Sequence, residues 1–124
     1  MLLVDDEPML LQALARLLRR TFDVSVSSAP AAAIEDLRTG TFDAVVCDLV
    51  MPGLSGVQVL AAARRYSPHT ARVLLTGGIV SDALPSPAEH AEIHRVLQKP
   101  VSLDELTAVL RELIAAGGTR GEAP

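Results

Sequence analysis

Five polar side chains stand within two residues of the ends of apolar runs of this sequence, and their types suit chemistry on a phosphate or on a divalent cation. Asp5 and Asp6 follow the first run, Asp48 follows a run in the middle of the chain, and Thr76 and Lys99 follow two later runs. Carboxylates gathered in one place repel each other, and a hard cation such as Mg²⁺, which prefers oxygen ligands, relieves that repulsion. A carboxylate beside Mg²⁺ and a lysine is a plausible nucleophile toward phosphorus.

The apolar runs have the pattern of strands in a parallel sheet, which would place these side chains together. Residues 44–47 and 73–75 are continuously apolar, as strands buried on both faces are. Residues 8–20 carry leucines at helical spacing, so strands and helices alternate. Ligands of an open parallel sheet bind beyond the carboxyl ends of its strands. We therefore expect Asp5, Asp6, Asp48, Thr76 and Lys99 to converge at that edge.

The same patterning predicts an α/β fold with one doubly wound, five-stranded parallel sheet and five helices. We expect strands at 1–4, 24–27, 44–47, 73–75 and 96–97, and helices at 8–20, 29–38, 55–66, 81–93 and 102–116. Pro85 and Pro87 should make the fourth helix short or irregular. Capping boxes are expected at Ser55 and Ser102. A Gly-Gly pair at 117–118 should end the last helix and leave 117–124 as a tail or linker.

Composition narrows the function classes. The chain has 124 residues, enough for one domain, and 49% are hydrophobic, which suffices for a core. Its net charge of −4 and 2% aromatic content disfavour direct nucleic-acid binding. Apolar runs are far shorter than the roughly 20 residues that span a bilayer, so no membrane association is expected. The single cysteine, Cys47, excludes an internal disulfide and is expected in the core; a cytoplasmic location is the simplest expectation.

Four motifs in order resemble the receiver domain of bacterial two-component response regulators. They are Asp5-Asp6-Glu7, Asp48-Leu-Val-Met-Pro-Gly53, Thr76-Gly77 and Lys99-Pro100. Each motif is weak alone, but together they cover residues 1–116, which we take as the receiver domain. The resemblance implies a flavodoxin-like sheet with strand order 2-1-3-4-5.

The resemblance also implies a role for each site residue. Asp48 would accept a phosphoryl group from a sensor histidine kinase or a phosphotransfer protein. Asp5, Asp6, Asp48 and the backbone carbonyl of Val50 would bind Mg²⁺, for which Mn²⁺ could substitute. Thr76 would bond a phosphoryl oxygen and Lys99 would pair with the phosphate. The Lys99–Pro100 peptide bond is expected to be cis.

On this basis the chain is expected to be a phosphorelay switch that catalyses only its own phosphorylation and dephosphorylation, and so not an enzyme with a separate substrate. Phosphorylation would alter the face formed by the fourth helix, the fifth strand and the last helix, which would contact a downstream effector domain or protein. A homodimer stays open. The family often has Tyr or Phe where this chain has Val96, so the signal would have to pass through Thr76 and the loop after it.

Two other functions compete with this prediction. A degenerate receiver could serve as a docking or dimerisation module that does not need phosphorylation, which the absent aromatic at Val96 favours. A hydrolase with an aspartate nucleophile, of the haloacid dehalogenase type, would need a second aspartate two residues after Asp48, where Val50 stands. The three histidines have no metal-ligand spacing, and surface positions are expected for His69, His90 and His94.

Overall fold

A five-stranded parallel sheet forms the centre of the computed structural model, which describes residues 1–77 and 93–122. The strand order is β2-β1-β3-β4-β5, and every neighbouring pair is parallel. This order confirms the predicted doubly wound, flavodoxin-like sheet. The strands are β1 (Leu2–Val4), β2 (Ser25–Ser27), β3 (Ala44–Asp48), β4 (Ala71–Gly77) and β5 (Arg95–Lys99).

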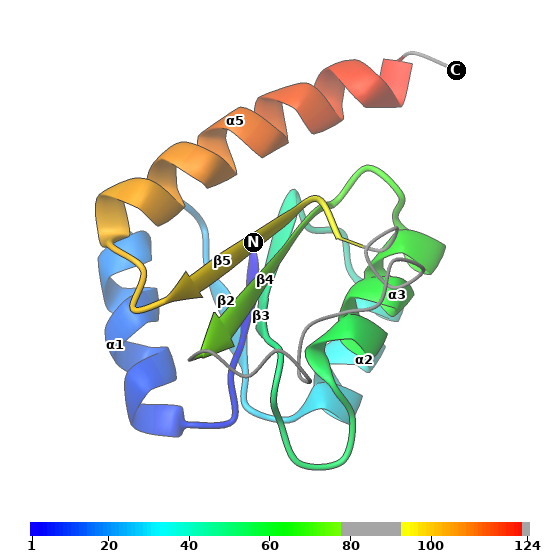
Figure 1. Cartoon of the computed structure of the whole chain (residues 1–124). Coiled ribbons are helices and arrows are strands. Elements are labelled where there is room, and N and C mark those ends of the chain that lie inside the picture. The colour runs from blue at the N-terminus through cyan, green and yellow to red at the C-terminus, as the bar shows by residue number, and fades with distance from the viewer. Residues whose placement is uncertain (78–92, 123–124) are drawn as a thin grey trace.

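Helices cover both faces of the sheet, as Figure 1 shows: α1 and α5 lie on one side of the strands, and α2 and α3 lie on the other. Their bounds are α1 (Pro8–Leu18), α2 (Pro30–Thr39), α3 (Gly56–Tyr66) and α5 (Leu103–Glu122). The fourth helix, expected at 81–93, falls, apart from Ile93, outside the described residues.

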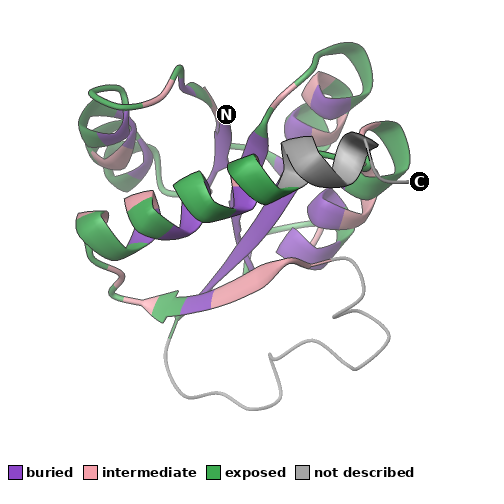
Figure 2. Ribbon diagram, turned by 90° about the horizontal axis from the view of Figure 1, so that it is seen from above, coloured by how far each residue is buried: buried purple, intermediate pink, exposed green. Residues whose placement is uncertain are grey.

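The core has two parts, one on each face of the sheet, and the central strands β1 and β3 are buried throughout (Figure 2). Alternate residues of each strand point to opposite faces. Leu3, Val46 and Val73 pack with α1 and α5, whereas Leu2 and Val45 pack with α2 and α3. Every residue of β3 is buried. A continuous apolar strand fits this place because it must present apolar side chains to both helical layers.

Several element ends differ from the sequence prediction. β4 and β5 are longer than the apolar runs 73–75 and 96–97, because strand pairing continues through polar residues at both ends of each run. The expectation that the glycines at 117–118 end the last helix is wrong, since α5 runs to Glu122. Glycine ends a helix by taking a left-handed conformation, and otherwise only weakens it by about 1 kcal/mol relative to alanine.

The capping box predicted at Ser55 is confirmed, and at Ser102 the structure shows the hydrogen bond to the hydroxyl of the predicted box. At α3 the side chain of Gln58 accepts a hydrogen bond from the backbone N–H of Ser55 at 2.9 Å. At α5 the Ser102 hydroxyl accepts one from the backbone N–H of Glu105 at 3.0 Å. Within the ranges 1–77 and 93–122, no helix combines the length and the apolar character that crossing a membrane requires.

Candidate functional site

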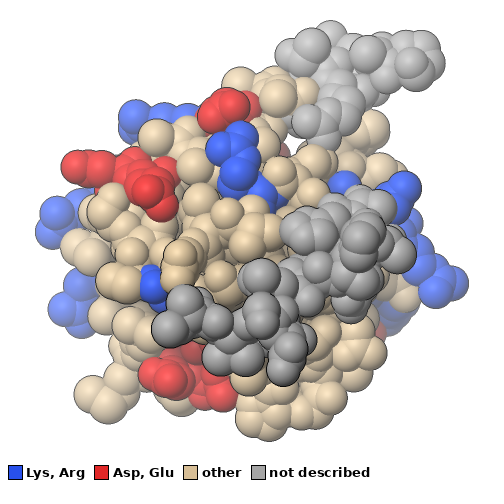
Figure 3. Space-filling view, in the orientation of Figure 1, with Lys and Arg blue, Asp and Glu red and all other residues tan. Residues whose placement is uncertain are grey.

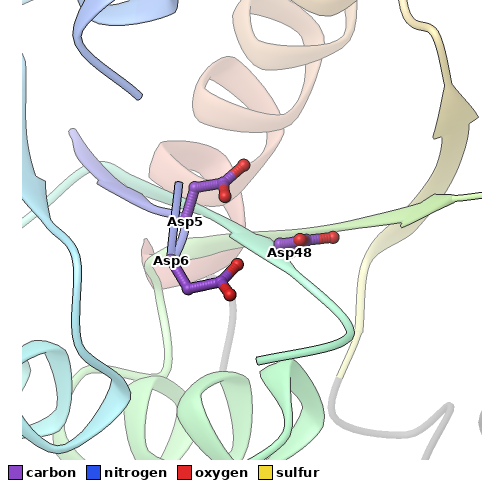
Figure 4. Close-up of side chains that lie close together, drawn as sticks. All are labelled: Asp5, Asp6 and Asp48. Atoms are coloured by element: carbon purple, nitrogen blue, oxygen red, sulfur yellow. The ribbon is translucent and has the colours of Figure 1, made fainter. Parts of the chain in front are cut away.

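Three carboxylates meet at the carboxyl edge of the sheet, as the sequence predicts. Asp48 is the last residue of β3, and Asp5 and Asp6 directly follow β1. Val4 and Cys47 are register partners on these two strands, so the acids come to the same level. One carboxylate oxygen from each of the three residues lies within 4.8 Å of the others. Figure 4 shows the three carboxyl groups turned to the same side of the chain.

The ammonium group of the one lysine, Lys99, joins this cluster. Lys99 ends β5, and its Nζ lies 3.2 Å from Oδ1 of Asp48 and 3.6 Å from Oδ2 of Asp5. The Asp48 and Asp5 side chains are 13% and 9% exposed, and that of Lys99 is 27% exposed. The ion pairs are therefore shielded from bulk water. Such shielded pairs interact more strongly than ion pairs exposed at the surface. The Lys99–Pro100 peptide bond is cis, as expected.

The site places its charged groups under opposing influences. Burial raises the pKa of Asp48 most; Lys99 acts to lower it and the acids Asp5 and Asp6 raise it further, so the net direction is upward. For Lys99, burial acts to lower the pKa, but the carboxylates of Asp48 and Asp5 together outweigh burial and raise it. The Lys99 ammonium thus stays charged, and the three carboxylates together carry more negative charge than this one ammonium neutralises.

The donor set fits a hard divalent cation. Carboxylate oxygens are the ligands that Mg²⁺ prefers, and one or two of them, with water and phosphate oxygens, complete its octahedron. Asp5 has one oxygen already engaged, because Oδ1 accepts a hydrogen bond from the backbone N–H of Glu7 at 3.0 Å. Asp6 is half-buried and Asp48 is buried. These residues therefore suit a site that holds Mg²⁺ with part of its coordination sphere open.

The two remaining predicted site residues lie at the same edge. Thr76 is buried in β4, one residue beyond Leu75, which is the register partner of Asp48. Val50 lies in the loop after β3, with its side chain 66% exposed. The structure brings Asp5, Asp6, Asp48 and Lys99 together by direct distances, and it brings Thr76 to them by strand register.

The loop between β3 and α3 is anchored by residues that the sequence analysis did not single out. Leu49 and Met51 on either side of Val50 are buried, and pack in the core beneath α2 and α3. Gly53 has a positive φ of 90°, a conformation in which glycine is favoured. The alternation of apolar and exposed residues after Asp48 is the signal that could have revealed this anchoring.

Gly56, the first residue of α3, was also missed. A Cβ atom at this position would lie 2.2 Å from the carbonyl oxygen of Asp48. Its position directly after the capping Ser55 is the only local signal, and a capped helix start does not by itself require glycine.

One expectation about the histidines is wrong. His94 is half-buried rather than on the surface, and its Nδ1 accepts a hydrogen bond from the backbone N–H of Arg72 at 2.9 Å. The backbone N–H of His94 donates in return to the carbonyl of Arg72 at 2.9 Å. His69 is exposed as expected, and His90 lies outside the described residues. Cys47 is buried as predicted, and burial raises the pKa of its thiol.

An apolar groove opens beside the acidic cluster. It has a volume of about 360 Å³ and lies between α1 and the segment that follows β5. Asp5 and Lys99 form its polar end, and its apolar walls are Leu10, Leu14, Leu75, Pro100 and Val101.

Comparison with known proteins agrees with this geometry. The family model of the response regulator receiver domain matches residues 1–111. The transcriptional regulatory protein TcrA of Mycobacterium tuberculosis is 38% identical over 94% of this chain and 46% of its own length. The hydrogenase transcriptional regulatory protein HoxA of Cupriavidus necator is 34% identical over 98% of this chain and 25% of its own. This chain therefore spans only part of the length of these relatives.

A solved structure shows the same fold with the ligand chemistry described above. The response regulator protein TrrA of Thermotoga maritima, solved in complex with Mg²⁺–BeF, superimposes with a TM-score of 0.77 at 26% identity. The alignment covers 90% of this chain and 96% of that one. By its sequence match and by its fold, the chain belongs to the response regulator receiver domain family of two-component signalling.

Proposed function

We propose that this chain is a Mg²⁺-dependent phosphoacceptor switch in which Asp48 takes a phosphoryl group from a phosphohistidine. The observation that carries the proposal is the meeting of Asp48 with Asp5, Asp6 and Lys99 at one edge of the sheet. An oxygen of Asp48 forms a bond to phosphorus while the P–N bond to the donor imidazole breaks. The imidazole leaves with the bonding electron pair and takes up a proton from solvent.

Each neighbour of Asp48 has a distinct task in this step. Lys99, already 3.2 Å from Oδ1, neutralises charge on the transferred phosphoryl group. Asp5 and Asp6 hold Mg²⁺, which when bound supplies a positive charge to the phosphoryl oxygens. Thr76, at the end of β4, donates its hydroxyl to a phosphoryl oxygen. Because Asp48 ends a fully buried strand, the nucleophile is held on a rigid element.

The surface around the site suits a protein donor. The groove beside Asp5 and Lys99 is mainly apolar, and α1 exposes Met9 at 88% and Leu10 at 47% next to it. Apolar side chains of this size on a helix are typical contact residues in a protein interface. We assign this side of the molecule to the sensor histidine kinase or phosphotransfer protein. The chain itself turns over no separate substrate and catalyses only the gain and loss of its own phosphate.

The output side is proposed to include β5 and α5. On the face seen in Figure 3, acidic and basic side chains are interspersed, and Arg95 of β5 pairs with Glu112 of α5 at 3.3 Å. Because the relatives TcrA and HoxA are named as transcriptional regulatory proteins and are longer than this chain, we propose that a downstream effector domain or protein reads this side. We assign the protein to the cytoplasm, where such partners act.

A second candidate function, a docking module that works without phosphate, is favoured by Val96. This residue is half-buried and packs into the core on the α2 and α3 side. Its short branched side chain offers no ring that could move between buried and exposed positions. If phosphorylation left the output side unchanged, docking alone would remain as the function.

Intact mass spectrometry after incubation with phosphoramidate, with and without Mg²⁺, tests the proposal. We expect a gain of one phosphate that needs Mg²⁺ and is absent in Asp48→Asn, while Asp23→Asn, an exposed acid near the opposite edge, behaves as wild type. Beryllofluoride, which mimics the phosphoryl group without hydrolysing, covers the case of a short-lived phosphate. A folded protein that gains no phosphate and binds no beryllofluoride would exclude the switch and leave the docking module.

A further inference from the structure

Gly56, at the start of α3, packs against the backbone carbonyl of the phosphoacceptor Asp48. We infer that it is a positioning residue: because it lacks a side chain, α3 packs directly on the backbone carbonyl of Asp48 and fixes the place from which the carboxylate meets Lys99. The inference rests on the proposed function and adds to it a residue outside the set of acids, hydroxyl and ammonium.

The space at Gly56 is closed by backbone atoms. A Cβ there would lie 2.2 Å from the carbonyl oxygen and 2.9 Å from the carbonyl carbon of Asp48, and 2.9 Å from Cδ1 of Leu74. Real Cβ atoms essentially never come within 3.0 Å of such neighbours. The Leu74 contact could be relieved by a side-chain rotation, whereas the two contacts with Asp48 could be relieved only by moving main chain.

The main chain around Asp48 is held on two sides. On one side Asp48 pairs with Leu75 of β4, and the backbone N–H of Leu49 donates to the carbonyl of Leu75 at 2.9 Å. On the other side the backbone N–H of Gly56 donates to the carbonyl of Leu49 at 2.9 Å. A side chain at Gly56 would therefore push α3 away from the sheet or turn the peptide between Asp48 and Leu49.

Turning that peptide would move the nucleophile. The carboxylate of Asp48 is bonded to the same backbone, and its Oδ1 lies 3.2 Å from Nζ of Lys99. Reacting groups must be held within a narrow geometry, and a misplacement of about 1 Å can cost about 100-fold in rate. The lack of a Cβ at Gly56 is thus a requirement of the reaction as well as of the packing of α3.

Four variants separate positioning from a loss of fold. Gly56→Ala adds the clashing atom, and Gly56→Ala/Leu74→Ala removes the side-chain clash while keeping the contacts with the Asp48 carbonyl. Leu74→Ala alone is the reference for the double variant. Gly40→Ala is the matched control, because its Cβ would lie 3.1 Å from the carbonyl oxygen of Asp36, a tight backbone contact at the end of α2.

Two kinds of measurement are made on each variant. The first is the phosphorylation rate over a range of phosphoramidate concentrations in saturating Mg²⁺, at a temperature where urea denaturation shows each protein to be folded. The second, which needs no phosphate or Mg²⁺, is the ¹H–¹⁵N spectrum, read at the amides of Leu49 and Lys99.

We expect Gly56→Ala to lower the maximal rate by about 10- to 100-fold with little change in the half-saturating phosphoramidate concentration, and to shift both amides. The double variant should be slower than Leu74→Ala by the same factor by which Gly56→Ala is slower than the wild type. Gly40→Ala should keep the wild-type rate. A folded Gly56→Ala protein with the wild-type rate overturns the inference, as does a double variant that reacts as fast as Leu74→Ala.

The remaining outcomes also decide. If Gly56→Ala does not fold, the double variant is compared with Leu74→Ala. If the double variant also fails to fold while Leu74→Ala folds, Gly56 serves the fold as a whole and the inference is overturned. If the wild-type chain takes no phosphate, the proposed function fails, and the spectra judge positioning alone. Unshifted amides of Leu49 and Lys99 in folded Gly56→Ala would then overturn it.

Discussion

Nζ of Lys99 lies 3.2 Å from Oδ1 of Asp48, across the gap between the ends of β5 and β3. The two strands are not neighbours, because β4 lies between them. The contact therefore depends on the long lysine side chain reaching over the end of β4, and the same Nζ also lies 3.6 Å from Oδ2 of Asp5.

Replacing Lys99 separates its charge from its shape. Lys99→Met leaves the carboxylates of Asp48 and Asp5 without their cation, and we expect it to lower the free energy of unfolding by about 2 kcal/mol at neutral pH, between the values for exposed and buried ion pairs. Lys99→Arg keeps the charge and should restore most of that stability. It should not restore phosphorylation, because the planar guanidinium differs in size and geometry from the compact ammonium. Urea denaturation and the phosphoramidate assay measure the two effects.

The alkaline limit of this contribution follows from the pKa of Lys99. Because the neighbouring carboxylates raise that pKa in the folded state, the stabilisation is complete below the unfolded value of about 10.4 and is lost as the pH rises through the folded value. The stability difference between the wild type and Lys99→Met should therefore shrink at strongly alkaline pH. A difference that stayed constant there would assign it to packing of the lysine chain instead of its charge.

Asp48→Asn should stabilise the protein in the absence of divalent cations. Burial, with Asp5 and Asp6, raises the pKa of Asp48 in the folded state, so the folded chain keeps this proton to higher pH than the unfolded chain. Wild-type stability then falls as the pH rises from about 3.9, the unfolded value, through the folded value. We expect Asp48→Asn to gain stability over the wild type above that window and to lose the advantage below it, in urea titrations with a chelator. Equal stability at neutral pH would contradict the raised pKa assigned to Asp48.

Much of this arrangement could be predicted from the sequence, and the rest has physical reasons. Continuous apolar runs before Asp48 and Thr76 predicted that these residues lie at strand ends. The rule that the carboxyl ends of parallel strands meet at one edge of the sheet then predicted that the site residues converge there. The roles of Gly56 and His94 depend on distant partners, the carbonyl of Asp48 and the backbone of Arg72. No local pattern reveals such contacts, because they form only when separate strands and helices pack together.

Mg²⁺ should raise the stability of the folded chain through the three carboxylates. A ligand that binds only the folded state adds about 2.7 kcal/mol to the free energy of unfolding when its concentration is about 100 times its dissociation constant. We expect this gain in thermal or urea unfolding with Mg²⁺ and also with Mn²⁺. Asp6→Asn should reduce it strongly, and Asp23→Asn, an exposed acid near the amino ends of the strands, should not. An undiminished gain in Asp6→Asn would place the ion elsewhere.

His94 should contribute to the join between β4 and β5. Its Nδ1 accepts the backbone N–H of Arg72 at 2.9 Å, so His94→Ala leaves that buried donor without this acceptor. We expect a loss of about 1–2 kcal/mol in the free energy of unfolding, the usual cost of a broken hydrogen bond at a buried group. His69→Ala, on the exposed turn before β4, is the control and should change stability by no more than about 0.5 kcal/mol. Equal effects of the two substitutions would show that the contact with Arg72 adds nothing.

Met51 should anchor the loop that follows the phosphoacceptor. The side chain is buried in the core beneath α2 and α3, and its loss would leave a cavity directly after Asp48. We expect Met51→Ala to cost about 2–5 kcal/mol of unfolding free energy. Met9→Ala removes the same side chain where it is 88% exposed on α1, and should stay within about 0.5 kcal/mol of the wild type. If the loop needs this anchor to hold the backbone of Val50 in place, the Mg²⁺-dependent gain in stability should also shrink in Met51→Ala and persist in Met9→Ala. Loss of stability with an unchanged Mg²⁺ effect would assign Met51 to the core alone.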